Sequence, residues 1–383
     1  MSPCMTDEQR MIRDTARDIA RKVLAPGAAA REAAGEIEPG LRDTLAELGF
    51  LGMTIAPDWG EVGADYISYA LALMEIAAGD GAVSTMVSVH NAPFLAVLDR
   101  YGTGIQKEQW LRPAAEGRFI GSFALTEPQA GTDAAALRSH ALRDGDHYVL
   151  TGSKQFISSA RIGGATIVFA VTAPGAGKRG ISAFYVENDT PGFIVGAAEA
   201  KLGQKASDTC ALSFEDLRIP AGNRIGDEGQ GYSIALSSLE AGRIGIAAQS
   251  VGMAQAAFRI ALDYSQDRTS FGKPLIEHQA MSFRLADMDA RIEAARQLVL
   301  NAARLKDAGA SCLREAAIAK LIASEMVEAV TSAAIQALGG YGYLEEYGLA
   351  RIYRDQRVCQ IYEGTSDVQR MIIARHFNSG ASA

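Results

Sequence analysis

Gln-Ile-Tyr-Glu-Gly-Thr-Ser-Asp-Val-Gln-Arg, at residues 360–370, is the stretch that says most about the fold and chemistry of this chain. Glu363 lies between an apolar dipeptide and a glycine, and Ser366 is placed to cap a following helix with Gln369 as its capping-box partner. An apolar loop solvates a carboxylate poorly, which raises its pKa and suits a base that removes a carbon-bound proton. A lone glutamate before a helix more commonly just complements the helix dipole. The interpretation of Glu363 therefore depends on motifs elsewhere.

Composition narrows the class of protein. The chain has 383 residues, of which 48% are hydrophobic and 21% charged, which is ordinary for a globular protein of two or three domains. Its formal charge of −8 argues against nucleic acid or an anionic membrane as the main partner, although local basic residues can still bind an anionic ligand. No stretch approaches the roughly 20 apolar residues that span a bilayer. A reducing cytoplasm is the simplest location, because the four cysteines form no CxxC pair.

The expected fold class is α+β and mainly α, in three domains. Residues 1–117 form an N-terminal helical domain, which starts with a helix capped by Thr6 and Gln9. Residues 118–226 form a middle β-sheet or barrel domain, and residues 227–383 a C-terminal four-helix bundle. The strands expected in the middle domain are His147–Leu150, Thr166–Val171, Ile181–Val186 and Cys210–Phe214, with a hairpin-like connection at residues 174–180.

Two periodic patterns support this organisation. In the run from Cys210, every second residue is apolar, as in a half-buried strand. In the C-terminal part, apolar residues step by four and three, which is a heptad stripe suited to a bundle: Met281, Leu285, Met288, Ile292, Ala295 and Val299. Further helices are expected at residues 315–338 and 366–377.

Several common catalytic motifs are missing from the sequence. It has no GxGxxG after a strand, no P-loop and no serine-nucleophile elbow. The five histidines show no metal-ligand spacing, and the cysteines show none either, so no metal site is expected. A Rossmann dehydrogenase or a serine hydrolase is therefore disfavoured.

Four further segments combine glycine turns with polar residues. They are Phe-Ala-Leu-Thr-Glu-Pro (123–128) with Ala-Gly-Thr-Asp (130–133), Gly-Ser-Lys-Gln-Phe-Ile-Ser (152–158), Arg-Thr-Ser-Phe-Gly-Lys-Pro-Leu (268–275) with His278 and Gln279, and Gln-Ala-Leu-Gly-Gly-Tyr-Gly-Tyr (336–343). Taken singly, each has a structural explanation, such as a strand entering a turn, a basic connector or a helix C-cap. Together with residues 360–370, and in this order, they resemble the acyl-CoA dehydrogenase family over residues 6–377. The runs 201–209 and 240–243 match as well.

The resemblance implies an FAD cofactor and a set of residues that bind it. It implies that the flavin ring lies beside Thr126 and that the Ser158 hydroxyl hydrogen-bonds flavin N5. It also implies that Arg268 pairs with the pyrophosphate of the FAD bound to a neighbouring subunit, because a forked guanidinium suits a pyrophosphate. The implied FAD residues are Phe123, Leu125, Thr126, Gly131, Thr132, Phe156, Ile157, Ser158, Arg268, Phe271, His278, Gln279, Gln336, Gly339, Gly340, Thr365, Ser366 and Asp367. Most relatives carry tryptophan at the position of Phe156 and many carry threonine at Ser158, so flavin packing differs in detail here.

The resemblance also implies the reaction. Glu363 removes the α-proton of an acyl-CoA thioester while a hydride leaves the β-carbon for flavin N5, and the Glu363 backbone N–H with a flavin ribityl hydroxyl stabilises the thioester oxygen. The implied substrate-binding residues are Thr132, Glu240, Gly242, Arg243 and Gly364. An electron-transferring flavoprotein is the expected electron acceptor, and a homotetramer the expected assembly.

The acyl group is expected to be short. The run at residues 239–248 looks most like short-chain and short-branched-chain members, and Gly242 stands where some relatives place an alternative catalytic glutamate. Residues 83–89 lack the arginine that glutaryl-type enzymes use, which disfavours a dicarboxyl substrate. Butyryl-CoA or hexanoyl-CoA is the expected best substrate, with isobutyryl-CoA or 2-methylbutyryl-CoA next. The pathways implied are fatty acid β-oxidation and branched-chain amino acid degradation.

Three alternatives stay open at this point. A flavin oxidase or monooxygenase on the same fold would also bind FAD, and turnover sustained by oxygen alone would reveal it. A relative acting on acyl carriers or another thioester would keep the same base. A non-catalytic helical interaction protein is the alternative of a different class, because fold alone does not give function, and it would be colourless when pure.

Overall fold

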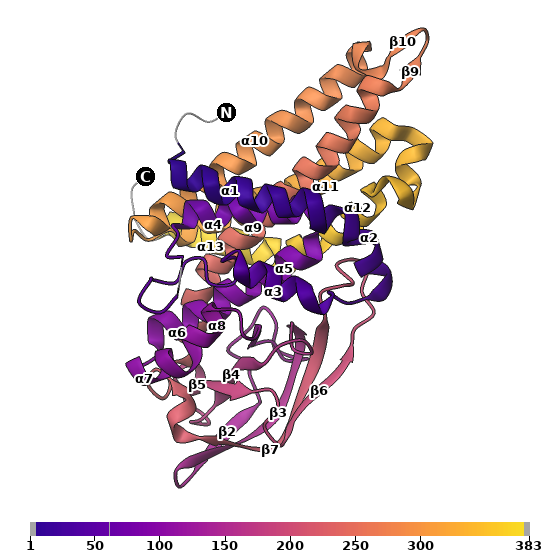
Figure 1. Cartoon of the computed structure of the whole chain (residues 1–383). Helices are drawn as coiled ribbons and strands as arrows, with labels where there is room; N and C mark the ends of the chain where they lie inside the picture. The colour runs from indigo at the N-terminus through magenta and orange to yellow at the C-terminus, as the bar shows by residue number, and fades with distance from the viewer. Residues whose placement is uncertain (1–4, 61, 379–383) are drawn as a thin grey trace.

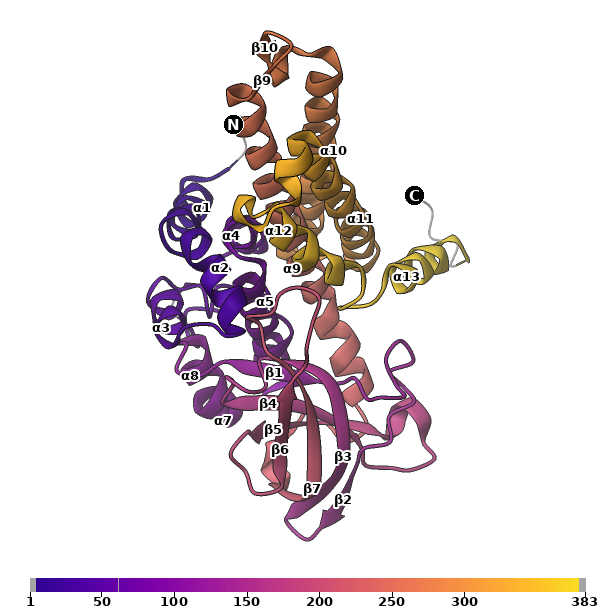
Figure 2. The same cartoon turned by 90° about the vertical axis from the view of Figure 1, so that its right-hand side faces the viewer.

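The computed structural model describes residues 5–60 and 62–378, and helices, strands and helices follow one another along this part of the chain (Figure 1). The expected class, α+β and mainly α, is confirmed. Figure 2 shows the strands of the middle part of the chain gathered at one end of the molecule and the long C-terminal helices extending to the other.

Short helices make up the first part of the chain. Thr6 and Gln9 form the expected capping box, in which each side chain accepts from the other residue's backbone N–H. The helices are α1 (Asp7–Ile19), α2 (Ala25–Ala34), α3 (Pro39–Glu47), α4 (Tyr66–Gly79), α5 (Gly81–Val89), α6 (Ala96–Tyr101), α7 (Gly104–Gln106) and α8 (Arg112–Ala115), with π-helical turns at Ala20–Leu24, His90–Leu95 and Lys107–Leu111.

One helical stretch departs from the sequence analysis. Gly81–Tyr101 is long and apolar enough to cross a membrane, with a mean hydropathy of 1.3, so the expectation that no stretch approaches this composition was wrong. Its most apolar window is 89% buried inside the protein. Packing of α5 and the following turn against other elements of the interior accounts for this composition, as in the core helices of many globular proteins.

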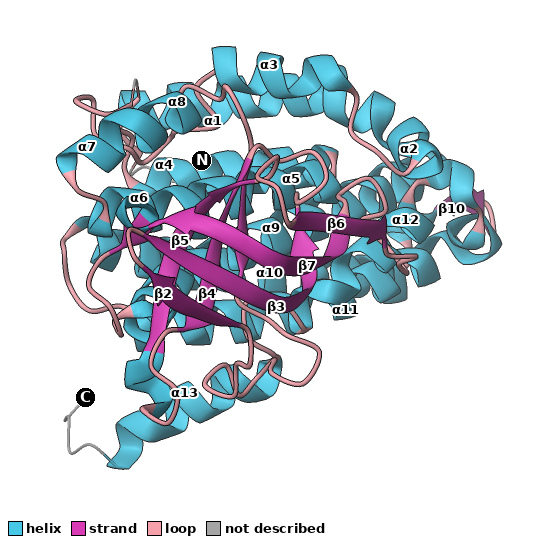
Figure 3. Ribbon diagram, turned by 90° about the horizontal axis from the view of Figure 1, so that it is seen from below, coloured by secondary structure: helices cyan, strands magenta, loops and turns pink. Residues whose placement is uncertain are grey.

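An eight-stranded sheet forms the middle of the chain, and the predicted strands are all present, although most are longer than expected. The sheet order is β6-β7-β3-β2-β4-β5-β8, and β1 pairs with β4 in parallel. The strands are β1 (Gly121–Ala124), β2 (His140–Asp144), β3 (His147–Ser158), β4 (Ala165–Val171), β5 (Ile181–Glu187), β6 (Phe193–Ala198), β7 (Thr209–Pro220) and β8 (Arg224–Ile225). Figure 3 shows the sheet lying beneath the helices.

The two faces of β4 and β5 enter different cores. Val168 and Phe184 point into a core inside the curved sheet, together with the alternate residues of β7 that the sequence pattern singled out. Phe169 and Tyr185 point the opposite way and pack with residues of α6 and α8. Because both faces are covered, these strands read as continuous apolar runs in the sequence.

Long helices complete the fold. Among them α10 buries the predicted heptad stripe, apart from the half-buried Met281. The helices are α9 (Gly231–Asp267), α10 (Gln279–Asp307), α11 (Leu313–Leu338), α12 (Leu349–Gln356) and α13 (Ser366–Asn378), and the short strands β9 (Thr269–Ser270) and β10 (Lys273–Pro274) link α9 to α10. The N-terminal α4 packs against α9 and α10, so one hydrophobic core joins the first and last parts of the chain.

The packing of α9 against α4 depends on a glycine. A Cβ atom at Gly252 would lie 2.1 Å from the backbone oxygen of Met74, which no real contact allows. The two backbones therefore approach one another only because this position has no side chain.

We expect Gly252→Ala to lower the free energy of unfolding by about 1–3 kcal/mol or more, because the added methyl group forces the two helices apart. Urea denaturation followed by circular dichroism measures this change. Gly40→Ala is the matched control: that helical glycine has open space around its Cβ position, and its replacement should leave stability equal or raise it by up to about 1 kcal/mol. Equal stability of the two variants would contradict the close-packing argument.

Candidate active site

Glu363 lies in a tight turn just ahead of α13. Its backbone φ is 54° and that of Gly364 is 90°, so the base candidate itself adopts the left-handed conformation that non-glycine residues rarely occupy. Such strain gathers at functional sites, where the surrounding structure has to hold it.

The helix after this turn is capped differently from the expectation. The hydroxyl of Thr365 accepts from the Val368 N–H at 3.3 Å, whereas the Ser366 hydroxyl is buried without a hydrogen-bond partner. Gln369 donates to the backbone oxygens of Glu363 (3.2 Å) and Gly364 (2.8 Å). The Ser366–Gln369 capping box was therefore wrong, because Thr365 takes the capping position and Gln369 binds the turn instead.

The Glu363 carboxylate is poorly solvated, as the sequence suggested. Its Oε2 is buried and has no hydrogen-bond partner. Burial raises the pKa of Glu363 to about 7, although the Arg243 guanidinium and the Lys320 ammonium act in the opposite direction. A carboxyl group with this pKa exchanges a proton readily near neutral pH.

Gly242 of α9 makes room for this carboxylate. A Cβ atom there would lie 2.6 Å from Oε2 and 3.0 Å from Cδ of Glu363. The structure thus brings the turn of Glu363 and Gly364 against Gly242 of α9, which lies far away in the sequence.

Arg243, the next residue of α9, has hydrogen-bond donors without an acceptor. Its side chain is buried, and its Nε and Nη1 have no hydrogen-bond partner. Burial lowers its pKa, while Glu363 and Glu240 act against that effect. Unpaired buried donors are costly, so this guanidinium fits a polar ligand group such as a carbonyl or phosphate oxygen.

Glu240 is engaged elsewhere. Its Oε1 accepts from Lys306 Nζ at 2.9 Å and from Cys312 Sγ at 3.3 Å, at the junction of α10 and α11. The structure gives this carboxylate protein partners of its own, two residues along α9 from Gly242.

A buried polar network next to Glu363 was missed by sequence reasoning. The Tyr362 hydroxyl donates to Gln249 Oε1 at 2.8 Å and accepts from Gln204 Nε2 at 3.3 Å, and the Thr85 hydroxyl donates to Gln204 Oε1 at 2.6 Å. Through Gln204, in the loop between β6 and β7, this network ties the sheet to the turn that carries Glu363. Its members come from four separate parts of the chain, and no local pattern could reveal them.

The residues predicted to hold the flavin ring come from the loop after β1 and from the C-terminal part of β3, which the structure joins. The Gln155 N–H donates to the Thr126 oxygen at 2.9 Å, which joins the loop after β1 to the end of β3. At this point β3 bulges: Phe156 has a φ of 60° and a side chain that is 64% exposed, while Ile157 points into the core of the sheet. Ser158 is half-buried beside them, and Gly131 and Thr132 are exposed.

A buried ion pair links β3 to the loop that follows β1. Lys154 Nζ donates to Glu127 Oε1 at 2.8 Å and to the Leu125 backbone oxygen at 3.2 Å. Burial lowers the pKa of Lys154 to about 8, against the pull of Glu127. The pair ties β3 to the loop that follows β1, and Phe156, two residues further along β3, is exposed.

The predicted FAD residues between Arg268 and Gly340 lie at the opposite end of the molecule, whereas Thr365, Ser366 and Asp367 lie at the start of α13. The β9–β10 hairpin stands at the top of Figure 1 and the sheet at the bottom. Phe271 in this hairpin is 95% exposed, His278 packs edge-on against it, and the Arg268 guanidinium lies 5.7 Å from the ring centre of Tyr341. Gln279 opens α10, and Gln336, Gly339 and Gly340 end α11 close to Tyr341. The structure therefore does not bring the two sets together within one chain.

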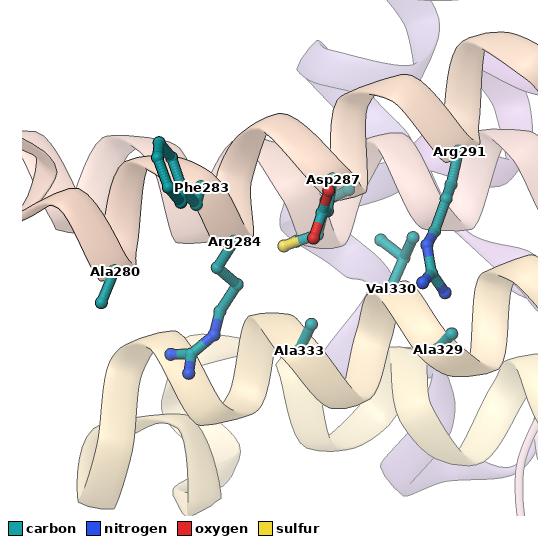
Figure 4. A pocket seen from close by; sticks show the side chains of 9 residues that line it. Ala280, Phe283, Arg284, Asp287, Arg291, Ala329, Val330 and Ala333 are labelled. Carbon is teal, nitrogen blue, oxygen red and sulfur yellow. The ribbon is translucent and has the colours of Figure 1, made fainter.

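An open groove of about 420 Å³ lies between α10 and α11 (Figure 4). Arg284 and Arg291 extend across it from α10 toward Ala329 and Ala333 of α11. None of its lining residues is among those assigned to the cofactor or the substrate.

Among residues 5–60 and 62–378, no group of three His, Cys, Asp or Glu side chains is placed to hold a metal ion.

Three family models match the chain in order. The acyl-CoA dehydrogenase N-terminal domain matches residues 6–118, the middle domain residues 122–217 and the C-terminal domain residues 229–377. The chain belongs to the acyl-CoA dehydrogenase family. It is thus an oxidoreductase that dehydrogenates acyl-CoA, and the resemblance seen in its motifs is confirmed.

Individual relatives agree with this result. The chain is 43% identical to the mitochondrial short-chain specific acyl-CoA dehydrogenase of Bos taurus, over 97% of this chain and 90% of that protein. Its structure matches butyryl-CoA dehydrogenase from Megasphaera elsdenii with a TM-score of 0.96 and 43% identity, covering 99% and 100% of the two chains. It also matches a glutaryl-CoA dehydrogenase from Mycobacterium smegmatis in complex with FADH2, with a TM-score of 0.93 and 31% identity, covering 99% and 96%.

We expect Gly242→Ala to reduce dehydrogenation by about 10–100-fold, because the new methyl group displaces the Glu363 carboxylate. Stability should be kept, since alanine is the better helix former and the displaced group is the end of a flexible side chain. A dye-reduction assay with butyryl-CoA and a thermal unfolding curve measure the two properties. Wild-type activity in this variant would show that the position of the carboxylate does not depend on Gly242.

Proposed function

We propose that the enzyme converts a short-chain acyl-CoA to the trans-2-enoyl-CoA in an FAD-dependent reaction, with Glu363 as the base. The observation that carries this proposal is the buried, unpartnered Oε2 of Glu363, in a side chain whose burial raises its pKa to about 7. A free acceptor oxygen is what a base needs, and the raised pKa favours removal of the weakly acidic α-proton.

The protein groups around Glu363 have complementary tasks. Glu363 takes the α-proton through its free oxygen, and its backbone N–H donates to the thioester carbonyl, where negative charge develops. The unpaired donors of Arg243 add a second polar contact for the substrate. FAD would supply the hydride acceptor for the β-carbon, and the residues proposed to hold it would orient it.

The proposed FAD site is shared between copies of the chain. Members of this family are flavoproteins, and the residues at the sheet edge fit a flat ring that lies on the exposed Phe156 near Thr126 and Ser158. Arg268, Phe271, His278 and Gln336, at the far end of the bundle, are then supplied by a neighbouring subunit to the pyrophosphate and adenosine half. Thr365 and Asp367 at the start of α13 complete the set. A homotetramer, with an electron-transferring flavoprotein as electron acceptor, is the proposed assembly and partner.

A short acyl group is supported by the relatives and by the residues near the base. The relatives named above include short-chain and butyryl-CoA dehydrogenases. Residues 83–89 of α5 are buried or nearly so and carry no charged side chain, so nothing there pairs with a second carboxylate.

Glu363→Gln should lower the rate of flavin reduction by acyl-CoA by about 10²–10⁴-fold or more, because the amide keeps the shape but cannot take the proton. FAD content, read from the visible spectrum, and binding of the thioester should persist. The exposed Glu215→Gln is the matched control and should behave as wild type. Near-normal dehydrogenation by Glu363→Gln would remove Glu363 from its proposed role.

We expect kcat/KM across a series of straight and branched acyl-CoA substrates to peak at butyryl-CoA or hexanoyl-CoA, with isobutyryl-CoA or 2-methylbutyryl-CoA next. Each methylene that fits changes binding by about 0.8 kcal/mol, so the preference should be graded. Parallel assays with an artificial acceptor and with oxygen alone separate a dehydrogenase from an oxidase. A maximum at palmitoyl-CoA or glutaryl-CoA would contradict the short-chain assignment.

A further inference from the structure

The turn that carries Glu363 is held by a buried lysine of α11. The Lys320 side chain has no exposed surface, and its Nζ donates to the Gly364 backbone oxygen at 2.7 Å. Gln369 donates to the same oxygen at 2.8 Å. Two donors thus converge on the carbonyl directly after the base, where the backbone is in the left-handed region.

The hydrogen bond to Gly364 alone does not explain why this residue is a lysine, because an uncharged donor could make the same bond to a backbone oxygen. Burying an ammonium group is expensive unless a negative charge or a strong acceptor lies near it. The acceptor of the Lys320 hydrogen bond belongs to the residue next to Glu363, and the ammonium charge is near enough to Glu363 to favour its ionised form.

The other groups that face Glu363 are few. Arg243 approaches from α9 and the Tyr69 hydroxyl from α4, while Cys359 and Tyr362 lie on its own segment. Burial raises the pKa values of Tyr69, Cys359 and Tyr362, so these three stay neutral near pH 7. Burial lowers the pKa of Lys320 only to about 8, which leaves it charged at neutral pH.

We propose that Lys320 is a positioning residue for the dehydrogenation: its hydrogen bond fixes the turn through Gly364, and its charge favours the ionised form of Glu363. This rests on the proposed role of Glu363 as the base. Gln369 shares the first task and, being uncharged, cannot share the second. The chain therefore offers a natural pair of variants that separates the two effects.

The test is the pH dependence of flavin reduction by butyryl-CoA, followed in an anaerobic stopped-flow instrument between about pH 5.5 and 9. In Lys320→Met, which keeps the length but loses the donor and the charge, the midpoint of the acidic limb should move up by at least about half a pH unit. In Gln369→Leu the rate should fall while the midpoint stays at the wild-type pH. Lys320→Arg, which keeps the charge, should also keep the midpoint.

An unchanged midpoint in Lys320→Met would overturn the proposal and leave Lys320 as a packing residue. If that variant does not fold, Lys320→Gln takes its place, with the same expected shift and the same contrary result. A shifted midpoint in Gln369→Leu would also contradict the proposal, because it would show that the turn alone sets the titration. Absence of flavin reduction in the wild type with every acyl-CoA would instead refute the proposed function.

Discussion

A carboxylate oxygen kept in the interior without a partner is the constraint on which the rest of this structure depends. Leaving such an acceptor unsatisfied costs about 1–3 kcal/mol, and the left-handed backbone of Glu363 adds about 1–2 kcal/mol. Neither cost is recovered within the turn. They are offset by helices α9 and α11, which hold the turn from two sides within a large core.

The same constraint explains why small and polar residues gather at this place. Gly242 leaves the volume that the carboxylate occupies, and Arg243 leaves donors open. The neighbouring network through Tyr362 and Gln249 is, by contrast, well hydrogen-bonded. Polar atoms without a hydrogen-bond partner occur at Glu363 and Arg243, whereas those of the neighbouring network have partners. The missing partners are therefore specific to the position where the substrate is proposed to react.

Local patterns in the sequence anticipated much of the fold. The heptad stripe of α10 and the alternation in β7 rest on periodic burial, which neighbouring residues alone can reveal. The cap of α13 was misassigned because Thr365 and Ser366 are adjacent and chemically equivalent, and only the backbone conformation chooses between them. The apolar stretch Gly81–Tyr101 was overlooked because polar residues and a proline interrupt it.

Only part of the candidate site could be predicted from the sequence, because its residues come from distant segments of the chain. Glu363 was predicted to be the base from its local surroundings and from the family resemblance, and this role stays a prediction. Lys320 gave no signal, because a lysine within a helical pattern is usually exposed. The network through Gln204 and Thr85 depends on contacts between distant segments. The bounds of the three domains and the assignment of the FAD residues stay predictions.

The shared core of the first and last helices has a consequence for biosynthesis. Helix α4 is almost wholly apolar and buried, yet its main partner α9 follows about 150 residues later in the chain. At a synthesis rate of roughly 5–20 residues per second, α4 emerges from the ribosome roughly 8–30 s before α9 can cover it. During that interval the apolar residues of α4 that pack against α9 lack their partner, and such transiently exposed apolar surface makes a folding intermediate prone to aggregation.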